Sequence, residues 1–174
     1  MKRIFLTSML IIFAITVIPL HADVKVGVAN LQRALDESEA GKQAVEKMKE
    51  FFQEKQKEIN RRKAELAQLK EEITNQSSLL TEEAKKDKMS TYQDRMKELQ
   101  RFIQDSNEEM RKKESEYVSK IARELRDVVK ELGRELGYDL IIEADQGGVL
   151  YNSNMVDITG KVIERYNRKW KAKD

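Results

Sequence analysis

The sequence lacks the residues that most catalytic sites and most disulfide-stabilised folds require. It contains no cysteine, a single histidine, His21, and a single proline, Pro19, and the last two lie near the amino terminus. The absence of cysteine excludes a thiol nucleophile and a disulfide framework. Because no histidine follows residue 21, an imidazole base and an ordinary zinc site are excluded from the rest of the chain. We therefore expect no catalytic residues, no metal site and no cofactor.

Aromatic residues are also scarce, and neither positive nor negative charge is in excess. Aromatic residues make up 6% of the chain and charged residues 37%. The 152 residues after residue 22 carry 31 basic and 31 acidic side chains, so their formal net charge is zero. This composition indicates elongated or assembled helices rather than a compact domain with a large core. A neutral chain is also a poor binder of nucleic acid.

The first 22 residues have the pattern of a secretory signal peptide. Lys2 and Arg3 precede an apolar stretch at 4–18, and the small residue Ala22 follows. We expect cleavage after Ala22 and export of the mature chain. The alternative is an uncleaved membrane anchor, but the apolar stretch is shorter than the ~20 residues that a spanning helix needs.

The middle of the chain is predicted to be a helical hairpin. Residues 42–132 contain neither glycine nor proline, so we expect helix almost throughout. Apolar residues recur at spacings of three and four along two stretches, which is typical of a coiled coil. The stretches are separated near residue 79 by a predicted turn, after which Thr81 is a suitable N-cap. The outgoing helix is predicted from about Glu39 to Asn75, with a length of ~55 Å.

The two ends of the chain are predicted to form a small base. Strands are expected at 24–28, 138–143 and 149–151, followed by a helix from about Ile158 to Trp170 that Asp157 caps. Three short strands are too few to be stable alone. The predicted domains are thus a signal peptide at 1–22, a β-rich body at 23–41 and 133–174, and the helical arm at 42–132.

The ends of the chain resemble the Skp family, the OmpH-like periplasmic chaperones. The resemblance rests on 139–144 (DLIIEA), 149–154 (VLYNSN) and 157–159 (DIT), and on 26–30 (VGVAN) near the beginning of the mature chain. The elements of this chain also follow one another in an order similar to that in members of the family: signal, strand, helical hairpin, strand pair and final helix. The resemblance therefore covers the entire mature chain.

The resemblance implies an α+β fold in which a long antiparallel coiled-coil hairpin projects from a small β-barrel body shared between three subunits. It further implies an ATP-independent periplasmic holdase for unfolded outer-membrane β-barrel proteins. The sequence contains no glycine-rich phosphate loop. The residues expected at the trimer contact are Val24, Val26, Val28, Leu140, Ile142, Val149 and Tyr151.

Client contact is expected from apolar residues of the arm that lie off the coiled-coil pattern or at its tip. These are Phe51, Phe102, Leu79 and Leu80. The methionines at 48, 89, 96 and 110 fall on the pattern and are predicted to belong to the core. Well-known relatives are strongly basic, whereas this mature chain is neutral, so local basic clusters such as 85–88 predict no more than weak contact with acidic lipid.

Other classes of function are compatible with parts of the pattern. A structural coiled-coil spacer of the cell envelope shares the helical pattern and the signal, but does not need a base of three strands. An enzyme is the weakest interpretation, because neighbouring acids such as Glu71-Glu72 and Glu108-Glu109 do not converge on one point of a helix. These acids are predicted to be solvated.

Overall fold

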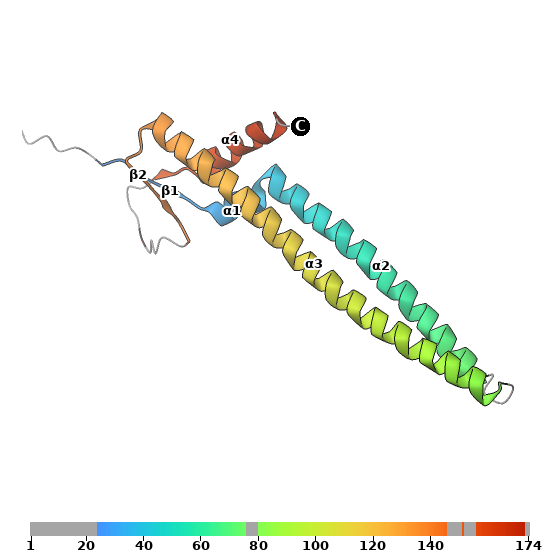
Figure 1. The fold of residues 1–174 in the computed structure, drawn as a ribbon. Coiled ribbons are helices and arrows are strands. Elements are labelled where there is room, and N and C mark those ends of the chain that lie inside the picture. Colours follow the sequence, from blue (N-terminus) through green and yellow to red (C-terminus); the bar gives the residue numbers. More distant parts are fainter. Residues whose placement is uncertain (1–23, 76–79, 146–150, 152–155, 173–174) are drawn as a thin grey trace, which may run out of the picture.

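The computed structural model describes residues 24–75, 80–145, 151 and 156–172. A long two-helix arm extends from a compact base, where the two ends of the described chain come together (Figure 1). In chain order the elements are β1 (Val26–Ala29), α1 (Leu31–Glu37), α2 (Glu39–Asn75), α3 (Glu82–Leu136), β2 (Leu140–Glu143), β3 (Val156–Asp157) and α4 (Thr159–Lys171). The prediction of long helices with a small sheet is confirmed.

The arm consists of α2 and α3, which run antiparallel and side by side (Figure 1). Helix α2 has the predicted bounds, Glu39–Asn75. The Thr81 hydroxyl accepts a hydrogen bond from the Ala84 N–H at 3.2 Å, which confirms the predicted N-cap of α3. Neither arm helix, nor any other helix in the described part of the chain, has a stretch apolar enough to cross a membrane.

The base end of α3 lies further along the chain than the glycine pattern predicts. The helix continues through Gly133 to Leu136, and Gly137 ends it in the left-handed conformation with φ of 66°. A Cβ at Gly133 would lie 3.0 Å from the Ile141 side chain. This glycine therefore allows close packing of β2 against the helix, and the predicted helix end at Leu132 is wrong.

A short helix, α1, which the sequence analysis did not predict, leads the chain from the sheet into the arm. The Asn30 Oδ1 accepts a hydrogen bond from the Arg33 N–H at 2.6 Å and so caps this helix. The buried Ser38 hydroxyl accepts from the Gly41 N–H at 3.1 Å and donates to the Leu35 carbonyl at 3.0 Å. A Cβ at Gly41 would lie 1.8 Å from the Leu35 carbonyl oxygen, so glycine is required at the corner between α1 and α2.

The sheet has the order β2-β1-β3, and both outer strands run parallel to β1. Strand β1 begins at Val26, so Val24 lies outside the strand in which it was predicted and is 61% exposed. Val149 lies outside the described residues, and Tyr151 is described but is not in a strand. The predicted strand 149–151 thus lies mostly outside the described residues, and at Tyr151, its last residue, the structure has no strand. The third strand of the described sheet is Val156–Asp157, which runs parallel to β1 and was not predicted.

The core lies where α3 meets α1, α4 and the sheet. Its buried members are Ala29, Ala34, Ala40, Ile121, Leu125, Val128, Leu132, Ile158, Val162 and Tyr166. Helix α4 turns Val162 and Tyr166 inward, as predicted, and begins one residue later than expected, at Thr159. The N-cap is Ile158, which makes no side-chain cap hydrogen bond, so the predicted cap at Asp157 is displaced by one residue. The Asp157 Oδ1 still accepts the N–H of Thr159, the first residue of the helix, at 2.8 Å.

Candidate functional site

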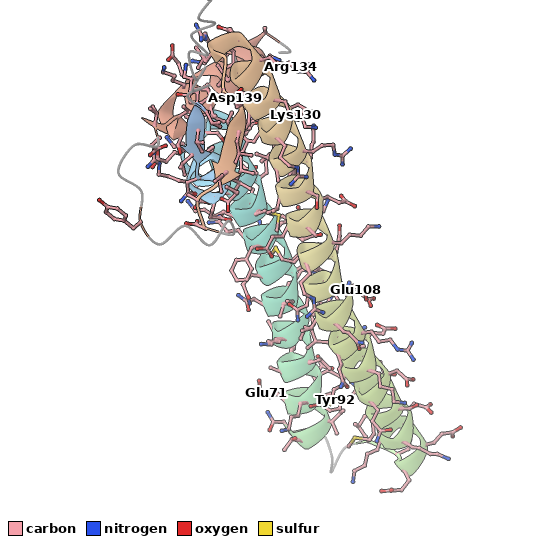
Figure 2. The ribbon with its side chains drawn as sticks, turned by 90° about the vertical axis from the view of Figure 1, so that its left-hand side faces the viewer. Glu71, Tyr92, Glu108, Lys130, Arg134 and Asp139 are labelled. Carbon is pink, nitrogen blue, oxygen red and sulfur yellow. The ribbon has the colours of Figure 1, made fainter. Side chains whose placement is uncertain are left out.

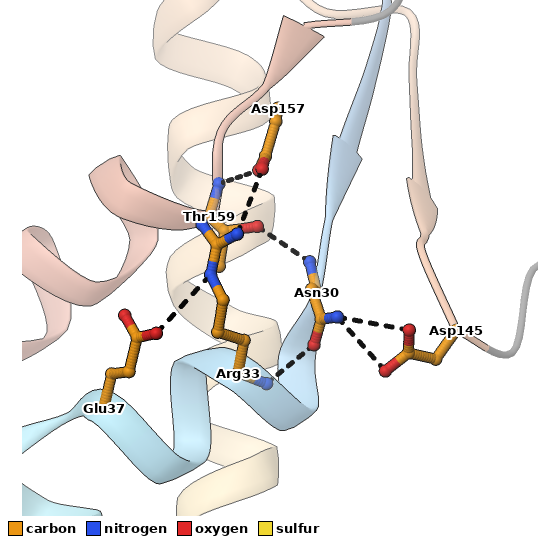
Figure 3. Close-up of polar contacts among 6 residues, drawn as sticks. All are labelled: Asn30, Arg33, Glu37, Asp145, Asp157 and Thr159. Carbon is orange, nitrogen blue, oxygen red and sulfur yellow. Dashed lines mark hydrogen bonds and ion pairs between the residues drawn. The ribbon is translucent and has the colours of Figure 1, made fainter. Parts of the chain in front are cut away.

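A polar network at the end of the three parallel strands fastens the base together (Figure 3). The Asn30 N–H donates to the Thr159 hydroxyl at 2.9 Å, and the Asn30 side-chain amide donates to both Asp145 carboxylate oxygens at 3.1 and 3.2 Å. Arg33 pairs with Asp157 at 3.4 Å. The pKa of Asp157 is lowered, chiefly by its hydrogen bond from Thr159. The network joins residues more than a hundred positions apart and so fixes the root of the arm.

A second set of contacts holds α4 against α3. Arg165 donates to both Glu135 carboxylate oxygens at 2.8 and 2.9 Å, and this hydrogen bonding lowers the pKa of Glu135. The Tyr166 hydroxyl donates to the Glu124 carboxylate at 2.7 Å. Burial raises the pKa of Tyr166, and the hydrogen bond to Glu124 raises it further. The basic and aromatic side chains of α4 therefore serve to dock this helix on the base.

One face of the small sheet is apolar. Val26 pairs with Leu140 and Val28 with Ile142, and because side chains alternate between the faces of a strand, these four residues share one face. The neighbouring residue Ile141 points to the opposite face and packs against the core. Leu140 is 51% exposed. Val28 is buried, whereas Val26 and Ile142 are half-buried, so the exposed part of this apolar face lies mainly at Leu140.

Two phenylalanines of the arm lie beneath cationic side chains. The Lys55 ammonium lies 4.9 Å from the centre of the Phe51 ring, and that of Lys113 lies 5.2 Å from the same centre. The Arg62 guanidinium lies 4.4 Å from the centre of the Phe102 ring. Both phenylalanines are half-buried. Their rings are attracted to these cations, which compete with any other partner for the ring faces.

Phe52, the residue after Phe51, is more exposed than Phe51. Phe52 is 54% exposed and, together with Val45 at 68% exposed, lines a hollow of about 520 Å³ between α2 and α3 near the base. A smaller hollow of about 210 Å³ shares Phe52 and Met110 with the first and extends toward the tip. We call the two adjoining hollows the arm groove. The apolar lining of its base half includes Val45, Met48, Phe52, Met110, Tyr117 and Val118, and the polar lining there consists of Gln32, Asp36, Lys49 and Glu114. Its outer half is further lined by Lys55, Gln56, Ile59, Lys63, Ile103, Ser106 and Asn107.

Ion pairs across the arm fix the two helices. The Lys88 ammonium lies 2.9 Å from Glu72, and the Lys55 ammonium lies 2.9 Å from Glu109. Glu72 and Glu109 are therefore paired between the helices and not simply solvated as predicted. Their neighbours Glu71 and Glu108 point outward on opposite sides of the arm (Figure 2).

Further ion pairs run along α2. Glu58 accepts hydrogen bonds from Arg61 and Arg62, and these lower its pKa to about 2. The carboxylates of the arm thus serve its charge pairs. Within the described part of the chain, no group of three or more histidine, cysteine or acidic residues is arranged to hold a metal ion.

Comparison with known proteins agrees with this architecture. The family model described as outer membrane protein (OmpH-like) matches residues 25–166, from the start of the sheet to the middle of α4. The chain belongs to the OmpH-like family. A Skp-like protein of Pseudomonas aeruginosa is 30% identical over 168 residues, which cover 95% of this chain and 98% of that protein.

A solved structure shares the OmpH-like fold. It is the crystal structure of a protein from Caulobacter crescentus that is assigned as an outer membrane chaperone (OmpH-like), with a TM-score of 0.78. The match covers 84% of this chain and 85% of that one at 18% sequence identity. At this identity the likeness establishes the fold alone.

The structure of this OmpH-like chain places the predicted site residues in separate regions. Val26, Val28, Leu140 and Ile142 come together on the sheet, whereas Phe51 and Phe102 lie half-buried on the arm. Leu79 falls outside the described residues, and Leu80 is half-buried immediately before the N-cap of α3.

Sequence reasoning missed several exposed apolar residues of the arm. Met89 and Met96 are 41% and 45% exposed, so their assignment to the core is wrong. Val45 and Phe52 follow the three-and-four spacing of the apolar residues in the outgoing helix, which predicts that they are covered, yet both are exposed. A pair of helices covers only the part of each apolar stripe that faces the partner helix, and spacing alone does not show where the two helices stop covering each other. The spacing itself contains no signal that separates these residues from the covered members of the same stripe.

Proposed function

We propose that the protein is an ATP-independent holdase of the periplasm, which binds unfolded outer-membrane proteins and prevents their aggregation before membrane insertion. The observation that carries this proposal is the exposure of large apolar side chains along an arm that projects from a separately packed base. Membership of the OmpH-like family supports it, as does the shared fold of the Caulobacter crescentus protein, which is assigned as an outer membrane chaperone. The signal pattern at 1–22 supports export.

We propose that three chains assemble through the base. The shared apolar face of Val26, Val28, Leu140 and Ile142 supports this arrangement, because Leu140 leaves half of its side chain uncovered in a single chain. Strand β2 is also an edge of the sheet, with backbone groups on one side that no strand of the described chain pairs. A small barrel formed from three such sheets covers these faces and removes the edges. The remaining expected contacts, Val24, Val149 and Tyr151, are proposed for the same surface.

The arms bind a client by many weak contacts. Phe51, Phe102, Leu79 and Leu80 are proposed contact residues, and the exposed residues around them add further apolar surface. Several arms around one client raise the effective concentration of each contact, so the overall affinity is high although every single contact exchanges readily. Release then requires no nucleotide, because the client leaves when it folds elsewhere. Contact with acidic lipid is expected to be weak, since the mature chain is neutral.

The proposal is tested by diluting an outer-membrane β-barrel protein from denaturant into buffer with and without the mature chain, in the absence of nucleotide. We expect the client to remain soluble when the chain is present, as measured by light scattering. A spacer protein of the envelope would leave aggregation unchanged, and that result would reject the chaperone function in favour of the structural one.

A further inference from the structure

The arm groove joins an apolar hollow near the base to a more polar hollow toward the tip. On α2 it extends from Gly41 near the corner with α1 to Lys63, and these residues recur at spacings of three and four on one side of the helix. Phe52 lies at the junction of its two halves and leaves 54% of its side chain uncovered. The groove is therefore a single one-sided strip and not a closed pocket.

The length of the groove fits a particular kind of guest. From Gly41 to Lys63 the helix rises by ~33 Å, at ~1.5 Å per residue. An extended chain rises ~3.3 Å per residue, so about ten residues of extended chain span the groove. A strand that crosses the outer membrane has about the same length, 9–11 residues, and alternates apolar with polar side chains. Such a segment turns all of its apolar side chains to one side and can lay them in the groove together.

The lining of the outer half indicates which charge the guest carries. Lys63, Gln56 and Asn107 line this half, and no carboxylate does. Lys55 also lines it, but its ammonium is already paired with Glu109 at 2.9 Å, so Lys63 is the lysine left to attract an acidic side chain. These side chains donate hydrogen bonds, so they complement the backbone carbonyls and the acidic side chains of an extended guest. The base half is largely apolar. The charge pattern thus favours a segment whose polar positions include acidic residues near one end.

The groove also contains a buried polar atom without a partner among the described residues. Ser106 lies there, only 7% of its surface is exposed, and its hydroxyl has no hydrogen-bond partner within the described part of the chain. A buried hydroxyl without a partner is unfavourable. Separation of the helices at this point lets water or the backbone of a guest bind the hydroxyl, which offsets part of the packing that is lost.

We propose that the arm groove binds one extended segment of an unfolded client, about as long as one membrane strand, with alternating apolar side chains and acidic residues at one end. This inference rests on the proposed function and specifies where the client binds and which feature of it is recognised. It places the principal contact at the exposed residues Phe52 and Val45. Phe51, whose ring lies beneath Lys55 and Lys113, contributes a smaller part of the contact.

The test uses a labelled ten-residue peptide in which leucine alternates with threonine and aspartate, the aspartates being near one end. Its binding to the full mature protein is measured by fluorescence anisotropy and compared with that of a peptide of equal composition whose leucines are contiguous. We expect the alternating peptide to bind more tightly by at least about fivefold, because only this pattern presents every leucine to the groove. Equal affinity of the two peptides would overturn the inference.

A residue of the groove and a residue on the outward side of the arm provide a pair of variants. We expect Phe52→Ser to weaken binding of the alternating peptide about fivefold, since a half-exposed ring is lost from the groove, and Glu108→Ser, on the outward side, to change it less than about twofold (Figure 2). Far-UV circular dichroism and the mass in solution are recorded for both variants, so that a loss of fold is recognised. If Glu108→Ser weakens binding as much as Phe52→Ser without loss of fold, the groove is not the site.

The absence of cysteine permits a direct readout of contact. A single cysteine at Val45→Cys, carrying an environment-sensitive dye, is expected to show a blue-shifted emission when an unfolded outer-membrane protein is added. The control Glu108→Cys places the dye on the outward side of the arm and is expected to show no shift (Figure 2). If the client is kept soluble but the dye at residue 45 does not respond, the groove inference fails while the proposed function stands. If the client is not kept soluble, the proposed function itself fails.

Discussion

The base and the arm of this molecule are packed in different ways. In the base, Leu125 and Ile158 are completely buried and Tyr166 is 2% exposed, within a cluster to which α1, α3, α4 and the sheet contribute. Between residues 42 and 120, the buried residues among those described are Leu66, Ile73, Leu99 and Ser106. The arm is held instead by charge pairs and by long side chains that lie over phenylalanine rings.

This difference shows how the tasks are divided along the chain. A fully buried cluster with polar contacts between distant residues gives one fixed arrangement, which suits a platform for assembly. Two helices alone bury little apolar surface, so their contacts are individually weak and much apolar surface remains open. A surface of that kind suits transient contact with many sequences. The comparison therefore predicts that changes in the base alter stability and assembly, and changes in the arm alter client binding.

The largest effect is expected for a cavity in the base. Leu125→Ala should lower the free energy of unfolding by about 2–5 kcal/mol, because the side chain is completely buried. Leu99→Ala, in the arm, should cost about 1–2 kcal/mol, since only one partner helix surrounds it. Urea unfolding followed by circular dichroism, at one protein concentration for both variants, measures the difference. Equal losses would remove the distinction between the regions.

The corner at which the base turns into the arm gives the next effect. Gly41→Ala should lower the free energy of unfolding by about 1–3 kcal/mol, because the added Cβ overlaps the Leu35 carbonyl. Gly160→Ala is the matched control, since a Cβ there meets nothing within 4 Å and alanine favours the helix by up to about 1 kcal/mol. Thermal unfolding of both variants distinguishes them. A Gly41→Ala protein as stable as the wild type would show that the corner is not close-packed.

A smaller effect, confined to client affinity, is expected from the covered aromatic residue of the arm. Phe102→Ala should weaken binding of an unfolded outer-membrane protein by about twofold to fivefold without changing the mass of the assembly. Its ring already lies beneath Arg62, so part of the ring is not available to a client. Titration of labelled client gives the affinity and light scattering gives the mass. An unchanged affinity would exclude Phe102 from the site.

The smallest effect is expected on the stability of the arm at low pH. Arg61 and Arg62 lower the pKa of Glu58 from 4.5 to about 2, so the charged form is favoured in the folded arm. The resulting stabilisation is fully present when the pH is above the pKa of Glu58 in the unfolded chain. It is lost as the pH falls from about 5 to about 2.5. Glu58 is exposed, so the effect is small. The melting temperature should therefore fall slightly less between these pH values in Glu58→Gln than in the wild type, and an identical fall would exclude this contribution.

Much of the arm was predictable because its determinants are local. Absence of glycine and proline, apolar spacing and the Thr81 cap act within a few residues of each other, and they placed α2 and the start of α3 correctly. Exposure was harder to predict, because spacing shows which side of a helix is apolar but not how far a partner covers it. Phe51 and Phe52 show this most clearly. Phe51, which lies off the pattern, is partly covered by lysine side chains, whereas Phe52, which lies on the pattern, is exposed.

The base was predicted less completely because its determinants are distant in the chain. Strand β3 has two residues and no pattern of its own, and it forms because β1 offers a free edge. Helix α1 has seven residues and depends on Asn30 and on the corner at Gly41. Val26, Val28, Leu140 and Ile142, four of the seven residues expected at the trimer contact, do share one face of the sheet, because alternation within a strand is again a local property. Their role in assembly stays a prediction.

Light scattering on the purified mature chain tests the central claim most directly, namely that the base assembles the molecule while the arms remain open. We expect a mass about three times that of one chain. Ile142→Asp should reduce it to that of a single folded chain, because a charge is placed on the apolar sheet face, whereas Val45→Asp on the arm should leave the mass unchanged. A wild-type chain that is stably folded as a monomer, or an assembly that Ile142→Asp leaves intact and Val45→Asp disrupts, would contradict the account.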